Sequence, residues 1–211
     1  MSAAEEPVAR RGSDRSEATR AALIDLAVQL FATRGYAETS MRDIAREGPV
    51  SMGAIYLHFR NKAELLVEAL EAKIDEDLEG AAAGGETPVD HVERLTEAGR
   101  DFESRRDLRA LLVQAAAAAQ TDDEARVRIR DAQQAHVDDW TERYEAHRER
   151  LELDPDLDLP TALLYTWATE LGLGMLEAFG MEPRNADHWA DVQNRVARSF
   201  RLPKDTGSSA T

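Results

Sequence analysis

The chain has 211 residues, of which 43% are hydrophobic and 32% charged, a composition that excludes a disordered protein and allows one large domain or two small ones. No apolar run approaches the roughly 20 residues of a membrane-spanning helix, and the N-terminus lacks a signal-peptide core, so we expect a cytoplasmic protein with no membrane partner. The absence of cysteine excludes disulfides, thiolate metal sites and cysteine nucleophiles.

The net charge of −15 is distributed unevenly along the chain. Residues 1–62 contain nine Lys and Arg and eight Asp and Glu, which leaves 17 basic and 33 acidic residues for residues 63–211. Because the acidic part repels phosphate, any contact with nucleic acid must come from the N-terminal quarter. Solubility explains the acidity of the larger part equally well.

Apolar residues recur at helical spacing along the chain, without the alternation of Val, Ile and Thr that is typical of a sheet. Gly35 and Gly180 end two of these periodic segments, and Asn61 with Glu64 forms a start that resembles a capping box. We therefore predict an all-α chain of about nine helices. The predicted helices cover approximately residues 17–34, 40–47, 51–57, 61–80, 87–103, 104–119, 122–150, 158–180 and 186–200.

Residues 39–62 indicate a DNA-binding function. They predict two short helices joined by a tight turn, then a Tyr-x-His-Phe corner at residues 56–59 and the start of another helix. One such unit near the N-terminus of a long helical chain is typical of a helix-turn-helix domain that is attached to a sensing body.

This segment resembles the TetR family of bacterial transcriptional regulators over about residues 22–66. The matching residues are Gly35-Tyr36, Thr39-Ser40-Met41, Asp43-Ile44-Ala45, Val50-Ser51, Gly53, Ile55-Tyr56, His58-Phe59 and Asn61-Lys62. Two positions depart from the family pattern. Pro49 replaces the usual glycine, and since proline cannot adopt a positive φ, we expect the turn to be re-formed around Gly48. Met52 replaces a lysine or polar residue, which removes one phosphate or base contact.

The resemblance implies that the second helix of the helix-turn-helix enters the major groove of DNA. The candidate DNA-contacting residues are Thr39, Ser40, Arg42, Ser51, Met52, Gly53, Tyr56, Leu57, His58 and Lys62. Gly53 allows the backbone to approach closely, and Met52 offers an apolar contact to a thymine methyl group. Thr39 and Ser40 are also explained as helix caps alone. With so few polar groups on this helix, we expect DNA shape to supply part of the specificity.

The resemblance also implies a C-terminal domain that dimerises through its last two helices and holds a ligand between the middle ones. The predicted dimer interface comprises Leu164, Trp167, Leu171, Met175, Trp189, Val192 and Val196. The candidate ligand-binding residues are Phe102, Leu112, His136, Trp140, Tyr144 and Tyr165. Either set is also explained as the core of a monomer. The predicted organisation is a flexible arm over residues 1–15, a helix-turn-helix domain over 16–62, a regulatory domain over 63–202 and a flexible tail over 203–211.

Other classes of function find little support in the sequence. Asp154, Asp156 and Asp158 resemble the start of a calcium loop, but Leu159 stands where that loop needs glycine and Tyr165 where it needs glutamate. No HExxH, P-loop, GxGxxG or GxSxG motif is present, so we predict no enzyme, cofactor or metal site. The predicted function is a homodimeric regulator, more specifically a repressor that a small amphipathic molecule releases from a near-palindromic operator. The alternative is a helical protein–protein interaction module without sequence-specific DNA binding.

Overall fold

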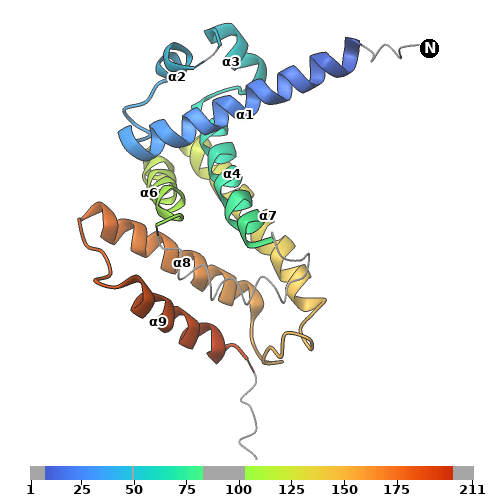
Figure 1. Cartoon of the computed structure of the whole chain (residues 1–211), viewed down its shortest axis with the longest axis vertical. Coiled ribbons are helices and arrows are strands. Elements are labelled where there is room, and N and C mark those ends of the chain that lie inside the picture. Colours follow the sequence, from blue (N-terminus) through green and yellow to red (C-terminus); the bar gives the residue numbers. More distant parts are fainter. Residues whose placement is uncertain (1–7, 49, 83–102, 202–211) are drawn as a thin grey trace, which may run out of the picture. The chain divides into compact units, whose positions relative to one another are not determined.

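The computed structural model describes residues 8–48, 50–82 and 103–201. Eight helices occupy these residues, whose only β pairing is an isolated antiparallel bridge between Leu153 and Arg201. The helices are α1 (Val8–Arg34), α2 (Met41–Glu47), α3 (Met52–His58), α4 (Lys62–Ala82), α6 (Arg106–Thr121), α7 (Asp123–Glu145), α8 (Leu159–Ala178) and α9 (Ala186–Ser199) (Figure 1). The all-α prediction is confirmed, whereas the helix predicted over residues 87–103 falls almost entirely outside the described residues.

The chain divides into two compact units. Unit 1 comprises residues 1–74 and 110–130, and unit 2 comprises residues 75–109 and 131–211. Unit 1 therefore contains α1 to α3 with parts of α4, α6 and α7, and unit 2 contains the remaining parts of α4, α6 and α7 with α8 and α9. This division differs from the predicted boundary after residue 62, because segments far along the chain pack into the N-terminal unit.

Helix α1 is longer than the sequence predicted. It begins at Val8, so the part of the predicted flexible arm between residues 8 and 15 is helical. Alanine and arginine in this stretch favour a helix, but the stretch has no apolar periodicity that would have indicated one. The rest of the predicted arm, residues 1–7, and the predicted tail lie outside the described residues.

The core of unit 1 is made of apolar side chains at helical spacing. Leu23, Ala27 and Phe31 form a buried stripe along α1, as residues three to four positions apart on one helix face do. The other fully buried apolar side chains of this unit are Ile44, Ile55, Phe59, Leu65, Leu66, Ala69, Leu70, Leu111 and Ala125. This core holds α2 and α3 against α1 and α4, and so fixes the geometry of the helix-turn-helix.

The turn between α2 and α3 depends on Gly48, but not for the reason that the sequence suggested. Gly48 caps α2 with a φ of −93° and a ψ of 173°, values that any residue can adopt. A Cβ atom at this position would lie 2.8 Å from the carbonyl oxygen of Ile44 and 3.1 Å from Cδ2 of Leu26. Glycine is therefore required because the backbone passes so close to α1 and α2. Pro49 lies outside the described residues.

In unit 2, α7 ends at Glu145 instead of residue 150, and the chain then turns back toward α8. The turn buries Leu151 and Leu153 against Tyr144, which accounts for the early end of the helix. Arg148 holds the returning segment, because its guanidinium donates to the carbonyl oxygens of Asp154 (2.6 Å) and Leu157 (3.1 Å).

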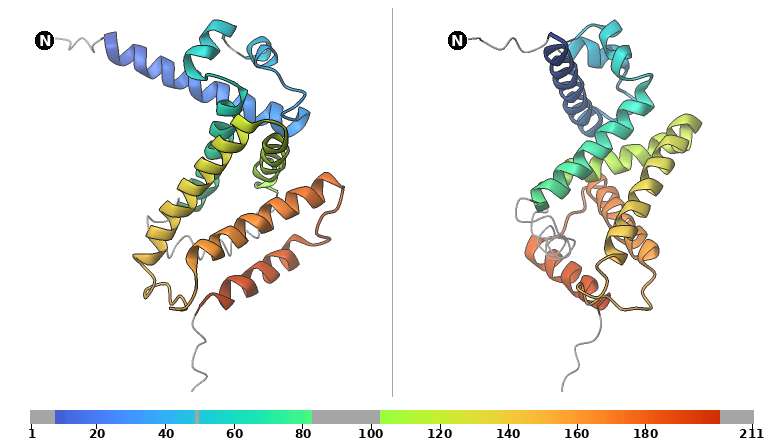
Figure 2. Two further views of the ribbon diagram at one scale, coloured as in Figure 1. Left: turned by 180° about the vertical axis from the view of Figure 1, so that it is seen from behind. Right: turned by 90° about the vertical axis from the view of Figure 1, so that its right-hand side faces the viewer.

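Helices α8 and α9 lie side by side in unit 2 (Figure 2). Asp158 caps α8 by accepting a hydrogen bond from the N–H of Thr161 (3.0 Å), and this contact lowers the pKa of Asp158. Gly180 follows α8 with a φ of +75°, and Asn185 caps α9 by accepting from the N–H of His188 (3.0 Å). Both helices therefore match the predicted spans to within a few residues.

Candidate nucleic-acid interface and effector cavity

Helix α2 begins at a reciprocal cap. The hydroxyl of Ser40 accepts a hydrogen bond from the N–H of Asp43 (3.2 Å), and the carboxylate of Asp43 accepts one from the N–H of Ser40 (3.0 Å). The hydrogen bonds to Ser40 lower the pKa of Asp43. Ser40 thus fixes the start of α2 while remaining at the surface, and Arg42 in the same turn is exposed as well.

Helix α3 buries one face and leaves the other open to solvent. Ser51 caps the helix by accepting a hydrogen bond from the N–H of Ala54 (3.4 Å). Ile55 is fully buried, whereas Tyr56 is 52% and Leu57 is 85% exposed. Gly53 is also exposed, and by helical spacing it lies on the same side as these two residues. We refer to Gly53, Tyr56 and Leu57 as the open face of α3.

The fold itself does not require glycine at position 53. A Cβ atom there would meet only the Oγ of Ser51, at 4.0 Å, which is ordinary van der Waals contact. Glycine inside a helix costs roughly 0.5–1 kcal/mol relative to alanine. Gly53 thus weakens α3, although packing within the protein does not require a glycine at this position. This is consistent with another molecule that approaches the α3 backbone closely.

Thr39 does not reach this surface. Its side chain is 1% exposed, and its hydroxyl donates a hydrogen bond to the carbonyl oxygen of Gly35 (2.8 Å). Gly35 has a φ of +93°, so the bond holds a sharp loop after α1. The prediction that the Thr39 side chain contacts DNA is therefore wrong, since its hydroxyl is used inside unit 1.

Lys62 is engaged within unit 1 by Tyr36. Its ammonium donates to the carbonyl oxygen of Tyr36 (2.7 Å) and lies 4.0 Å from the centroid of the Tyr36 ring. Burial lowers the pKa of Lys62, while Asp122 and Glu38 act in the opposite direction. The Tyr36 hydroxyl lies 3.4 Å from a carboxylate oxygen of Asp122, and burial with this carboxylate raises the pKa of Tyr36 to about 12. Lys62 could contact a DNA phosphate only if its ammonium gave up the hydrogen bond to the carbonyl oxygen of Tyr36.

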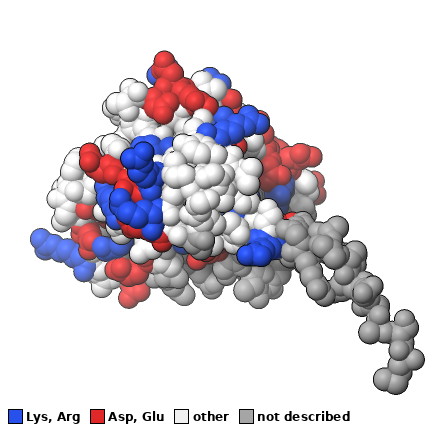
Figure 3. Space-filling view, turned by 90° about the horizontal axis from the view of Figure 1, so that it is seen from above, with Lys and Arg blue, Asp and Glu red and all other residues white. Residues whose placement is uncertain are grey.

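Basic and acidic side chains are mixed around α2 and α3. Arg34 pairs with both carboxylate oxygens of Glu47 (2.9 and 3.1 Å), and Arg46 pairs with Asp43 (2.7 Å). Arg42 forms no ion pair with any residue that the structure describes. Figure 3 shows basic side chains on either side of an uncharged area at this end of the molecule. The uncharged surface therefore has basic side chains next to it.

Unit 2 contains a cavity of about 100 Å³ between α8, α9 and the segment that joins α7 to α8. Leu153, Leu159 and Phe200 contribute to its apolar wall. Arg105 and Glu170 line it as well, and they form an ion pair (2.7 Å) that is largely buried. An apolar cavity with a few polar groups is typical of a site for a small organic molecule.

A second ion pair lies deeper in unit 2. The guanidinium of Arg109 is 1% exposed and donates to both carboxylate oxygens of Glu177 (2.6 and 2.7 Å). With the Arg105–Glu170 pair, it ties the start of α6 to α8. The sequence could not indicate either pair, because charged residues on helices are more often solvated.

Two further observations on the described residues concern metal binding and membrane insertion. They include no group of three or more His, Asp and Glu side chains arranged to hold a metal ion. Among the helices that the structure describes, none combines the length and the apolar character needed to cross a membrane.

The geometry of α2 and α3 agrees with a known family of DNA-binding domains. The family described as "Bacterial regulatory proteins, tetR family" matches residues 23–69, which include α2, α3 and the turn between them. The chain carries a TetR-family DNA-binding domain over these residues. Its sequence similarity to curated regulators extends over at most half of the chain, whereas the structural similarity extends over most of it.

Two curated TetR-type regulators illustrate this. The probable HTH-type transcriptional regulator ArpR and the HTH-type transcriptional regulator TtgR, both of Pseudomonas putida, are each 37% identical over 105 residues. These residues are 50% of this chain but only 44% of each relative, so the chain spans less than half of their length. A TetR-family regulator structure from Rhodococcus sp. has a TM-score of 0.72 at 19% identity, covering 87% of this chain and 98% of the other, and so has the same fold.

Two of the residues predicted for a ligand site line the cavity, namely Tyr144 and Tyr165. Leu112 is buried in unit 1, and Phe102 lies outside the described residues. Leu112 was selected because it is apolar, and a core residue has the same pattern.

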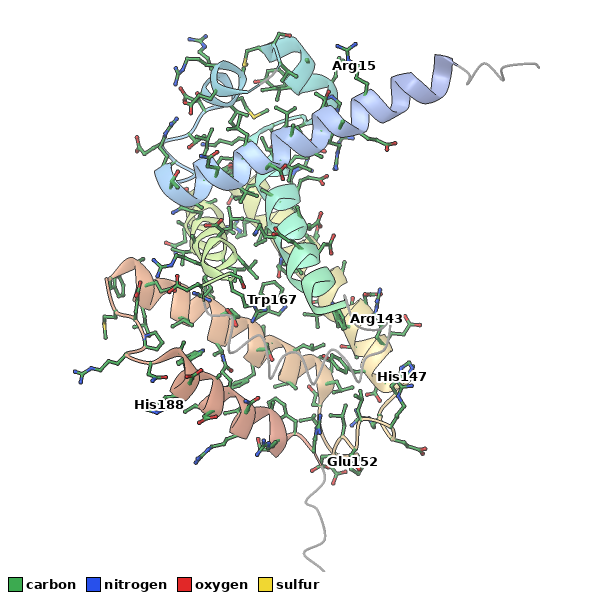
Figure 4. The ribbon with its side chains drawn as sticks, viewed as in Figure 1. Arg15, Arg143, His147, Glu152, Trp167 and His188 are labelled. Carbon is green, nitrogen blue, oxygen red and sulfur yellow. The ribbon has the colours of Figure 1, made fainter. Side chains whose placement is uncertain are left out.

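His136 and Trp140 are not part of the cavity wall. His136 packs edge-on against Trp167, with ring centroids 5.5 Å apart, and burial lowers the pKa of His136. Figure 4 marks the position of Trp167 on α8. The ring centroid of Trp140 lies 5.7 Å from that of Tyr144 and 5.2 Å from the guanidinium carbon of Arg143. The four rings form an aromatic cluster of unit 2, in which His136 and Trp140 are partly buried.

The predicted dimer residues divide into two groups. Leu164, Met175 and Val192 are exposed, as an interface that awaits a partner requires. Trp167, Leu171, Trp189 and Val196 are partly buried, and Val196 lines the cavity. The structure adds three exposed apolar residues that the periodicity did not select, namely Leu176, Phe179 and Met181.

Proposed function

We propose that this TetR-family chain is a transcriptional regulator, in particular a homodimeric repressor that a small amphipathic molecule releases from a near-palindromic operator. The observation that carries the proposal is the open face of α3 in a domain of a DNA-binding family. In such domains the second helix of the helix-turn-helix enters the major groove. A helical protein-interaction module is the alternative, and the family assignment disfavours it.

The proposed contacts follow the exposure of the side chains. Besides the open face of α3, they are Ser40, Arg42, Ser51, Met52 and His58. The two serines and Arg42 would bind phosphate, which fixes the register of the protein on the duplex. Lys62 would join them only by leaving Tyr36.

Replacing Tyr56 by alanine is expected to weaken DNA binding about tenfold, with the fold intact, because this half-exposed side chain lies on the open face of α3. Binding is measured on the DNA that flanks the gene of this protein, at several salt concentrations, with circular dichroism as the check on folding. Phosphate contacts predict a steep decrease of affinity with salt.

Val127 provides a matched control for Tyr56→Ala. It is also an exposed apolar residue of unit 1, but it lies on α7, so Val127→Ala should leave DNA binding unchanged. Equal losses for the two variants, or affinity that is indifferent to salt, would favour the protein-interaction module.

The exposed apolar residues of α8 and α9 support the proposed homodimer. Leu164, Met175 and Phe179 lie along one side of α8 at helical spacing, and Val192 is exposed on α9. Soluble monomers rarely expose apolar patches of this kind without a partner. A two-fold arrangement of α8 and α9 would bury them and place two copies of α3 along one duplex.

The substitution Met175→Glu is expected to convert the dimer to a monomer, since it places a charge in the proposed apolar contact. Sedimentation velocity measures the mass, and Val127→Glu adds the same charge at an exposed apolar residue of unit 1 as a control. A parent chain that sediments as a monomer, or a Met175→Glu variant that stays dimeric, would contradict this interface.

The cavity of unit 2 is our proposal for the effector site. Its volume of about 100 Å³ is smaller than cavities that hold a single benzene ring, so it would take only the apolar part of an effector. The Arg105–Glu170 pair offers the polar contact at its wall. If the effector favours a form that binds DNA poorly, DNA must weaken effector binding by the same factor.

A further inference from the structure

The open face of α3 is strongly apolar. Leu57, at 85%, is the most exposed large apolar residue of the described part of the chain, and Tyr56 adds a half-exposed aromatic ring. Met52, one turn before Tyr56, is partly buried and leaves some of its side chain accessible. A leucine exposed to this extent has an unfavourable solvation free energy and does not stabilise the fold. We therefore expect its side chain to contact a partner molecule.

This helix lacks the side chains that read most base pairs by hydrogen bonds. Guanine is usually read by Arg or Lys and adenine by Asn or Gln, and α3 (MGAIYLH) contains none of the four. Its cap, Ser51, already accepts a hydrogen bond from the N–H of Ala54. The open face of α3 therefore offers the bases mainly apolar contact.

One base offers an apolar group in the major groove, namely thymine through its C5-methyl group. Gly53 would allow the helix backbone to come close to the base edges, because no side chain stands between them. The charge next to α3 favours nucleic acid over an apolar protein partner, since Arg42 and Arg60 are exposed and form no ion pair with described residues.

We infer that the open face of α3 reads thymine methyl groups, so that Leu57 and Tyr56 specify T·A pairs in each half-site by apolar contact. The inference rests on the proposed function and adds the chemistry by which the operator is recognised. Leu57 is then a specificity-determining residue, and the operator half-site contains thymine where Leu57 meets the groove.

Replacement of thymine by deoxyuridine tests this, because it removes the methyl group and retains base pairing. The full-length protein first selects its preferred duplex from random sequences, and each thymine of that duplex is then replaced in turn. We expect one or two replacements per half-site to weaken binding roughly three- to tenfold, the effect of one or two buried methyl groups. Replacements outside the half-sites should have no effect.

The Leu57→Ala variant connects the effect to the residue. It should bind the thymine duplex less tightly and lose its sensitivity to deoxyuridine at one position, while Val127→Ala keeps the full sensitivity. Since Leu57 is almost fully exposed, the substitution leaves the core unchanged.

Two outcomes would overturn the inference, and they differ in what they leave standing. A selected duplex that is bound equally well with deoxyuridine at every position would exclude methyl readout and retain the proposed DNA-binding function. Failure to select any sequence would remove the proposed function and the inference with it.

Discussion

Replacing Gly53 by alanine is expected to stabilise the protein and to weaken its binding to operator DNA at least tenfold. Alanine should add about 0.5 kcal/mol to the free energy of unfolding, because the new methyl group meets only the Oγ of Ser51, at an ordinary contact distance, and glycine is a poor helix residue. The same methyl group would separate the α3 backbone from the base edges, where direct readout needs contact. Urea denaturation measures the first effect, and titration of a dye-labelled duplex measures the second.

Gly48→Ala is the matched control for this substitution, with the opposite effect on stability. Its Cβ would lie 2.8 Å from the carbonyl oxygen of Ile44, and overpacking of this kind costs about 1–3 kcal/mol. DNA binding of folded Gly48→Ala should change less than that of Gly53→Ala. If Gly53→Ala binds operator DNA as tightly as the parent chain, α3 does not approach DNA through Gly53.

Removing the carboxylate of Glu177 is expected to produce the largest loss of stability, about 3–5 kcal/mol for Glu177→Ala. The guanidinium of Arg109 is 1% exposed and donates to both oxygens of this carboxylate, so the variant removes a carboxylate that a buried charge binds through two hydrogen bonds. The midpoint and slope of urea denaturation measure the loss, and a second transition would show whether unit 2 unfolds separately.

Two further variants distinguish a buried charge from lost packing. Arg106 and Glu182, each with a side chain that is 47% exposed, form a pair near the same end of α6, and Arg106→Ala should cost at most about 1 kcal/mol. The double variant Arg109→Met with Glu177→Leu removes both charges and should regain most of the stability lost in Glu177→Ala. If it stays as unstable as Glu177→Ala, the loss comes from packing.

Features determined by neighbouring residues could be predicted from the sequence. The end of α8 shortly before Gly180 and the cap of α9 at Asn185 each depend on a few adjacent residues, and both lie within a few residues of the predicted positions. The start of α1 could not be predicted in this way, because residues 8–15 are helical although their sequence has no apolar periodicity.

Features that depend on residues far apart along the chain could not be predicted from the sequence. Thr39 has the chemistry of a helix cap, but its burial follows from the loop at Gly35. Lys62 matches the phosphate-binding position of the family, yet its ammonium is held by Tyr36, 26 residues earlier. Arg109 and Glu177 are 68 residues apart and carry no local signal of their pairing. For the same reason, the sequence could not show which apolar residues line the cavity and which belong to the core.

The division into two units has a spectroscopic consequence. All three tryptophans of the chain, at positions 140, 167 and 189, belong to unit 2, and the aromatic side chains of unit 1 are phenylalanines and tyrosines. Selective excitation of indole therefore observes unit 2 alone, including the aromatic ring beside Tyr144 at the cavity wall. A dye on the duplex would report the helix-turn-helix independently, so one sample could give two optical signals, one for effector binding and one for release of DNA.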